Sequence, residues 1–369
     1  MSSSLTIGSA RIPLIEVFAT VVDPRARRGV RHDLAVVLAL AAAAVMSGSR
    51  SLLSMGEWVL DADREALSRL GIGPGVGLPS ESTIRRTLAA VNADDLDRLI
   101  GAWMATRVRT VEGRRVIAVD GKSLRGATRD GVMPHLLAAL DHDAGIVLAQ
   151  RAVPDKGSGI PAIKDLLGAI DLAGAVITAD ALHCQRDTAN WLIEHGADYL
   201  MTVKGNQPTL RAKLKNLPWS QVPGHTYRDT GHGRRVTRTV KAVVVPAWVD
   251  WPGAAQVLQV RRTRIIKGRK HVEVVYAICS VPTKHATPQL VACWIQGHWG
   301  IENALHWVRD VTFDEDRHQL RVGNGPHVMA ILRNTAISLL RLTGWTRIAA
   351  GLRHHAADSR RPITLLATP

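Results

Sequence analysis

The segment VIAVDGKSLRGA, residues 116–127, begins with an apolar run that ends in an acid and a glycine, Asp120 and Gly121. An uninterrupted run rich in valine and isoleucine is typical of a strand that is buried on both faces. A second run of this kind, GAVITADAL at residues 174–182, carries Asp180 at the corresponding place. Two buried strands that each end in an acid predict an α/β fold with a mixed sheet.

Further strands and helices alternate around these two runs. We predict strands at residues 134–141, 145–154 and 198–205, and helices at residues 159–171 and 185–196. The resulting order along the chain is strand, strand, strand, helix, strand, helix, strand. This order predicts a mixed sheet flanked by helices.

The character of the sequence differs on either side of this region. The N-terminal part holds several amphipathic segments separated by short turns, which predicts a helical bundle. Beyond the α/β region the residues alternate as in strands, and helical patterns then return. We therefore divide the chain into a helical bundle, the first part of the core, a basic all-β insertion, a catalytic helix with C-terminal helices, and a tail: residues 1–108, 109–215, 216–285, 286–345 and 346–369.

The chain is strongly basic. Its 369 residues include 47 Lys and Arg against 32 Asp and Glu, a net charge of +15, and the pI is about 10.5. Residues 203–271 alone hold 15 Lys or Arg and 2 Asp or Glu, a net of +13. This balance indicates a polyanionic partner, either nucleic acid or an anionic membrane.

Other features of the composition favour nucleic acid over a membrane. The longest apolar run, residues 34–48, is too short to span a bilayer and too far from the N-terminus for a signal peptide. The three cysteines show neither a disulfide framework nor zinc-site spacing. We therefore expect a cytoplasmic protein that binds nucleic acid and has no membrane partner.

Asp120 and Asp180 are candidate catalytic residues. Neighbouring parallel strands would bring their carboxylates together, where they repel each other unless a divalent cation binds them. Mg²⁺ prefers carboxylate oxygens, water and phosphate, so this pair beside a basic surface predicts metal-dependent phosphoryl transfer. Glu302 is the candidate for the third metal ligand, and Asp310 is the alternative.

Glu302 lies in the segment HWGIENALHWVRDVTF, which we expect to be helical. On an α-helix, His298, Glu302, His306 and Arg309 would share one stripe, at steps of four, four and three residues. The two tryptophans of the segment are expected to pack inward. In this arrangement the cationic side chains offset the charge of Glu302, and His298 and Arg309 contact DNA phosphates.

Ten further residues are candidates for DNA contacts, because each is polar or basic and lies near a predicted acid, turn or basic strand. They are Lys122, His183, Lys204, Asn206, Gln207, Arg85, Arg86, Arg261, Arg262 and Arg264. Each also has an ordinary structural interpretation, as a surface lysine, a polar turn or a solvated helix face.

Several long motifs occur in a fixed order along nearly the whole chain. They are VVDPRARRGVRHDLAVVLALAAAAVMSG, PSESTIRRTL, VIAVDGKSLRGA, ITADALHCQRDTA, YLMTVKGNQP, HWGIENALHWVRDVTFDED and GNGPHVMAILRNTAISLLR. Together they resemble the motifs of bacterial insertion-sequence DDE transposases of the insertion-sequence As type, a branch that includes the H-repeat-associated proteins. The first two resemble the helical domain associated with that branch.

The resemblance implies an RNase H-like catalytic core in which Asp120, Asp180 and Glu302 are both catalytic residues and metal ligands. It implies cleavage and strand transfer of an insertion sequence with two Mg²⁺ ions, for which Mn²⁺ can substitute. The expected partners are the element ends and target DNA, with a dimer on DNA and the N-terminal bundle binding the ends. Two other functions stay open: a transposase-derived DNA-binding protein without catalysis, and a stand-alone RNase H-like nuclease.

Overall fold

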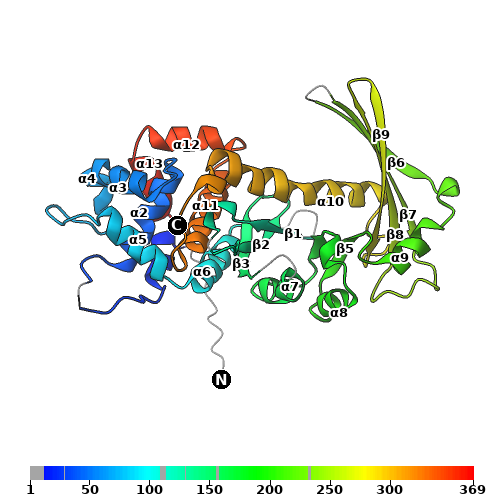
Figure 1. The fold of residues 1–369 in the computed structure, drawn as a ribbon, viewed down its shortest axis with the longest axis horizontal. Coiled ribbons are helices and arrows are strands. Elements are labelled where there is room, and N and C mark those ends of the chain that lie inside the picture. The colour runs from blue at the N-terminus through cyan, green and yellow to red at the C-terminus, as the bar shows by residue number, and fades with distance from the viewer. Residues whose placement is uncertain (1–11, 29, 109–113, 129, 155–157, 232–233) are drawn as a thin grey trace.

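The computed structural model describes residues 12–369 apart from residues 29, 109–113, 129, 155–157 and 232–233. Figure 1 shows three regions in a row: a helical region, a central sheet with covering helices, and a long β region. The predicted boundary after residue 108 borders residues 109–113, which lie outside the described residues. Within the described ranges, each helix is too short or too polar to cross a bilayer.

One nine-stranded sheet runs through the central and β regions, in the order β3-β2-β1-β4-β5-β9-β8-β7-β6. Its first half consists of β1 (Val116–Ser123), β2 (His135–Asp141), β3 (Val147–Val153), β4 (Val176–Ala179) and β5 (Asp198–Val203). β1 is antiparallel to β2 and parallel to β4, and β4 is parallel to β5. This confirms the predicted α/β class and the RNase H-like mixed sheet flanked by helices.

The second half of the sheet is the basic insertion. It consists of β6 (Gly224–Gly231), β7 (Arg234–Val244), β8 (Gln256–Ile266) and β9 (Arg269–Cys279). All four strands are paired antiparallel, so the expected all-β character is confirmed. Because β9 pairs with β5, the insertion extends the core sheet and does not form a separate one.

Helices cover both faces of the central sheet. They are α7 (Gly159–Leu167), α8 (Arg186–Glu194), α9 (Pro208–Lys215), α10 (Pro288–Gly300) and α11 (Gly325–Leu342). Ile117 and Val119 of β1 point into the core formed with α7 and α8. Ala118 points to the opposite core, which contains residues of α11 and of the segment after α10. Asp120 follows the alternation of the strand and lies on this second face.

The helical region contains the predicted N-terminal bundle together with the C-terminal helices. Its members are α1 (Leu14–Ala19), α2 (Leu34–Met46), α3 (Leu52–Asp61), α4 (Arg64–Ser68), α5 (Glu81–Ala90), α6 (Ala93–Ala105), α12 (Ile348–Ala356) and α13 (Arg360–Ala367). α2 is buried almost all round, because alanine, leucine and valine occupy every side of it. The last 24 residues were expected to form a tail, but α12 and α13 pack against this bundle and share its core.

A buried acid joins the bundle to the sheet edge. Asp97 of α6 is 8% exposed, and its Oδ2 accepts a 2.6 Å hydrogen bond from the backbone N–H of Gln150 in β3. Burial raises the pKa of Asp97 from 3.8 to about 7. Between these values the folded state keeps a proton that the unfolded state has lost, so stability falls as the pH rises.

Asp97→Asn should therefore stabilise the protein by about 2 kcal/mol at pH 8 and have little effect at pH 4. The free energy of unfolding in urea, measured at both pH values for both proteins, checks this. An equal change at the two pH values would contradict the assignment of the slope to Asp97.

Candidate active site

Asp120 and Asp180 lie on the parallel pair of strands. Val119 of β1 is paired with Ala179 of β4, so the acids that follow them lie at the same level of the sheet. β4 ends before Asp180, as expected. β1 was expected to end at Asp120, but it continues to Ser123 because its last residues stay paired with β2. Asp120 is therefore held inside a strand, and Asp180 begins a loop.

The loop after β4 fixes the position of Asp180. One carboxylate oxygen of Asp180 accepts a 2.9 Å hydrogen bond from the backbone N–H of Leu182. Two predicted DNA-contacting residues, Asn206 and Gln207, donate side-chain hydrogen bonds to backbone carbonyls of loop residues 181–184. In the folded chain, these two amides hold the loop that carries the second acid.

The helix that carries Glu302 is not the continuous α-helix expected. α10 passes into two π-helical segments, η4 (Ile301–His306) and η5 (Val308–Thr312). In a π-helix each residue turns less about the axis, because the hydrogen bonds join i to i+5. Arg309, seven residues after Glu302, therefore does not lie on the same side of the helix as Glu302. π-helical turns are frequent at functional sites.

Glu302, His306 and Asp120 form one cluster between η4 and β1. His306 Nδ1 lies 3.5 Å from a Glu302 carboxylate oxygen and 3.7 Å from an Asp120 carboxylate oxygen. One ligand atom from each residue lies within 4.8 Å of those of the other two. The Glu302 side chain is 53% exposed and that of His306 is 5% exposed, so the cluster opens to solvent on the Glu302 side.

The electrostatics of the cluster favour a bound cation. Burial, together with the charges of Glu302 and Asp180, raises the pKa of Asp120 to about 7. The hydrogen bond with His306 lowers the pKa of Glu302, and burial lowers that of His306. Two carboxylates and a neutral imidazole are a donor set that suits a divalent ion such as Mg²⁺ or Mn²⁺. Such an ion would offset the burial and the repulsion that raise the pKa of Asp120.

The predicted phosphate contacts of Arg309 and His298 do not fit the structure. Arg309 has no exposed surface, and its guanidinium pairs at 2.9 Å with Glu315 and donates to Gln150. His298 Nδ1 is hydrogen-bonded to the Thr178 hydroxyl at 3.1 Å, and burial lowers the pKa of His298. Arg309 is therefore neutralised inside the protein, and His298 is a poor cation for DNA.

Lys122 and His183 are also buried. The Lys122 ammonium donates to Asp310 and lies 3.8 Å from Asp316 and 4.0 Å from Glu315. Since Lys122 is 8% exposed and His183 only 1%, their predicted DNA contacts are corrected to buried roles. Asp310, the alternative third ligand, is paired with Lys122 outside the acid cluster.

Trp299 and Trp307 were expected to pack inward but are 51% and 56% exposed. They present apolar surface on both sides of Glu302. Sequence reasoning also missed Thr178, whose hydroxyl is hydrogen-bonded to His142 as well as to His298. The signal that could have found Thr178 is its place two residues before the second acid, on the same face of the strand.

The remaining candidates for DNA contacts lie at the surface, and their roles stay predictions. Lys204, Arg85, Arg86 and Arg261 are exposed, and Arg262 and Arg264 are partly exposed. Arg85 is paired with Glu81 one turn earlier on α5.

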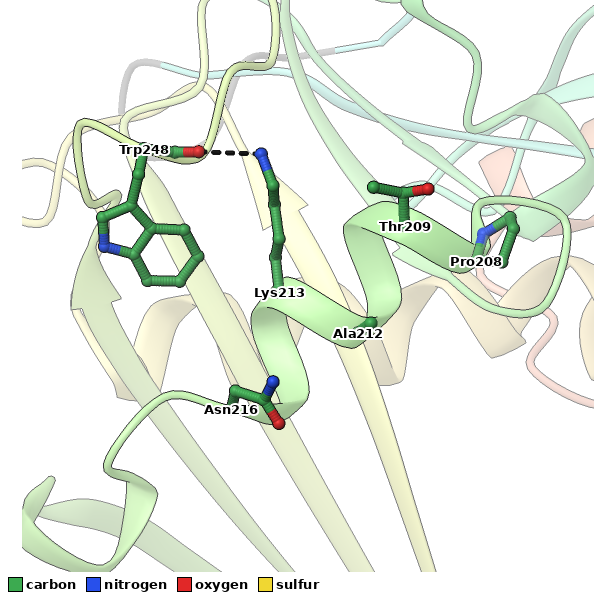
Figure 2. A pocket seen from close by; sticks show the side chains of 6 residues that line it. All are labelled: Pro208, Thr209, Ala212, Lys213, Asn216 and Trp248. Atoms are coloured by element: carbon green, nitrogen blue, oxygen red, sulfur yellow. Dashed lines mark hydrogen bonds between the residues drawn. The ribbon is translucent and has the colours of Figure 1, made fainter.

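A shallow hollow lies elsewhere, between α9 and the loop that follows β7. Figure 2 shows Lys213 on α9 and Asn216 at its C-terminal end, with Trp248 across from Lys213. The Lys213 ammonium donates a 2.8 Å hydrogen bond to the Trp248 carbonyl. None of the clustered acids lines this hollow, so it is not part of the candidate active site.

Comparison with known proteins finds matches over most of the chain. Residues 112–339 match the family described as "Transposase DDE domain", and residues 15–104 match the family associated with it. The chain is 31% identical to "Putative transposase YncI" of Escherichia coli O157:H7, over 89% of this chain and 87% of that protein.

Two further likenesses were found. The chain is 30% identical to "H repeat-associated putative transposase YhhI" of Escherichia coli K12, over 92% of this chain and 93% of that protein. A remote likeness, with a TM-score of 0.45 and 11% identity, links it to a chain of a piggyBac transposase synaptic complex with hairpin DNA, covering 99% of this chain and 81% of that one. From the matched domain and the close relatives, the chain belongs to the family of transposases that carry a DDE domain.

Proposed function

We propose that this transposase cleaves DNA strands at the ends of its element and joins them to target DNA in a reaction that depends on Mg²⁺. The observation that carries the proposal is the cluster of Asp120, Glu302 and His306, with Asp180 at the same level on the next strand. Its charge favours a divalent cation, and its exposed side leaves room for a DNA strand to approach.

Asp120, Asp180 and Glu302 would hold the metal, and His306 offers a further nitrogen ligand suited to Mn²⁺. When bound, the metal supplies Lewis-acid stabilisation of the scissile phosphate and activation of the attacking oxygen. The protein contributes position: β1 fixes Asp120, the loop hydrogen bonds fix Asp180, and η4 brings Glu302 beside Asp120. Phosphoryl transfer needs little more than such placement and charge neutralisation.

The test is a cleavage and joining assay on a duplex that carries the end of the element. With Mg²⁺ we expect a free 3′-hydroxyl at the end and covalent joining of that strand to a second DNA. Cleavage without joining would favour a nuclease, and binding without either reaction would refute catalysis. Joining two ends needs two active sites, so we also propose a dimer on DNA, measurable as two chains per paired-end complex by mass in solution.

Gln207→Ala should reduce cleavage about tenfold and leave DNA affinity within about twofold. The Gln207 amide donates a 3.0 Å hydrogen bond to the Cys184 carbonyl, and its loss lets the Asp180 loop shift by a fraction of an ångström. Misplacement of a reacting group by about 1 Å costs up to about 100-fold in rate. The measurement is single-turnover cleavage beside a binding titration. An equal loss of affinity would instead assign Gln207 to DNA contact.

A further inference from the structure

One face of the nine-stranded sheet can be followed from the active site into the basic insertion. Ala118 of β1 is paired with Thr178, Thr178 with Leu200, and Leu200 with Cys279 of β9. Paired residues lie on the same face, and residues two apart on a strand share that face. Asp120, two residues after Ala118, therefore shares its sheet face with alternate residues of the insertion.

On the insertion this face carries an arginine cluster. Glu273 of β9 is paired with Arg262 of β8, and Arg262 with Arg238 of β7, so the three form a row across the strands. Arg264 lies two residues beyond Arg262 on the same face. Arg261 lies on the opposite face, although it is the direct neighbour of Arg262 in the sequence.

A single helix links this cluster to the active site. α10 packs along the shared face from β1 and β4 to β6 and β7, and its apolar residues cover Leu258 and Val240. Two residues beyond Val240 lies Arg238, whose guanidinium carbon is 5.8 Å from the centre of the Tyr227 ring. Tyr227 packs against the α10 core, close to Cys293. The arginine cluster therefore lies directly beyond the part of the sheet face that α10 covers.

The cluster has fewer acids than arginines. Arg262 pairs with Glu273 at 3.3 Å, and Arg264 lies 4.0 Å from the same carboxylate. Among the residues that the structure describes, buried nitrogen atoms of Arg238, Arg262 and Arg264 have no hydrogen-bond partner. Like charges directly opposite each other on neighbouring strands are destabilising, so this arrangement favours an anion that bridges them.

Net charge alone does not select this face. The opposite face carries five cationic residues, which are Arg228, Arg235, Lys241, Arg261 and Lys270. The strand register distinguishes the two faces, because only the face that carries Arg238 and Arg264 is continuous with the sheet face of Asp120. Along α10 and the start of η4, Cys293 and Glu302 are nine residues apart, or about 14 Å at about 1.5 Å per residue. This is less than one turn of duplex DNA, about 34 Å.

We propose that Arg238, Arg262 and Arg264 bind backbone phosphates of the duplex that enters the active site, within one helical turn of the cleaved bond. The position relative to the bond rests on the proposed function, whereas the phosphate binding does not. The arginines would fix the path of the duplex along α10 without reading its sequence. The cations of the opposite face would contribute little to this duplex.

The first test compares two double variants that remove equal charge. Arg238→Gln with Arg264→Gln should reduce the slope of log K against log salt by about 1.8 units on any duplex, since each phosphate contact contributes about 0.9. The control, Arg261→Gln with Lys270→Gln on the opposite face, should change the slope by less than about 0.5 unit. Circular dichroism establishes that both variants are folded. Equal slopes for the two variants, or a larger loss in the control, would overturn the proposal.

The second test locates the duplex with a tethered iron–EDTA reagent that cuts nearby DNA. Cys293 is exposed and the other two cysteines are buried, so the reagent attaches at Cys293 in the unmodified sequence. Cuts from Cys293 should centre within about 10 base pairs of those from the Cys293→Ser, Glu302→Cys variant, about one helical turn. If only the reagent at Cys293 cuts DNA, the proposal that the arginines bind the duplex stands and the proposed active site is wrong. If only the reagent at position 302 cuts DNA, the proposal for the arginines is wrong.

Discussion

Asp120→Asn should abolish DNA cleavage, with a rate at least about 1,000-fold lower, which corresponds to about 4 kcal/mol of lost transition-state stabilisation. The asparagine keeps the size of the side chain and its place in β1 but removes the charge that a divalent ion requires. We expect the same result for Asp180→Asn and Glu302→Gln. Single-turnover cleavage of an end-containing duplex with Mg²⁺ measures the effect.

Asp120→Asn should not lower the stability of the fold. Burial and the neighbouring carboxylates raise the pKa of Asp120 to about 7, so its charge destabilises the metal-free protein at neutral pH. Asp120→Asn should therefore unfold at the same temperature as the original protein or higher, and bind DNA with unchanged affinity. Loss of cleavage together with a lower unfolding temperature would point to misfolding and not to a lost metal ligand.

Asp310→Asn is the matched control for the third acid. Asp310 is paired with Lys122 and lies outside the cluster, so its replacement should leave most of the cleavage activity. Cleavage that survives Glu302→Gln but not Asp310→Asn would transfer the role of third ligand to Asp310.

Glu315→Gln should destabilise the protein by about 3–5 kcal/mol, because it leaves buried cations without their counter-charge. Glu315 is 3% exposed and pairs with Arg309 at 2.9 Å and Arg333 at 2.8 Å. Burial alone would raise the pKa of Glu315, but the two guanidinium groups lower it to about 2. The free energy of unfolding, measured with urea at pH 7, checks the expected loss.

The sign of the pH dependence gives a second readout. Because the folded pKa of Glu315 is below the ordinary value of 4.5, its contribution is complete above pH 4.5 and is lost as the pH falls towards 2. Glu315→Gln should remove that part of the acid sensitivity. Arg317→Gln is the control, since Arg317 is 85% exposed and its pair with Asp314 should contribute less than about 1 kcal/mol. Equal stability of the two variants would refute the role of the buried network.

The local pattern of the sequence was sufficient to predict the helices and strands and to place an acid in or directly after each of two buried strands. Apolar runs gave the buried strands β1 and β4, and Asn92 caps α6 through a hydrogen bond to the N–H of Asp95, as the pattern S/T/D/N before a helix predicts. The parallel pairing that brings Asp120 and Asp180 to one level follows from two buried strands in a mixed sheet. These features depend on neighbours along the chain, which the sequence displays directly.

The burial and the partners of individual polar side chains were decided by the tertiary structure. Arg309 was expected at DNA but is buried, because the π-helical turns rotate it towards Gln150, a residue 159 positions away. Arg261 and Arg262 have the same chemistry in sequence, yet strand register places Arg262 on the face of Asp120 and Arg261 on the other. The sequence by itself determined which elements form and which acids they carry. Which charged side chains are buried in pairs and which stay exposed was decided only by helix rotation and strand register, since both depend on partners remote in the chain.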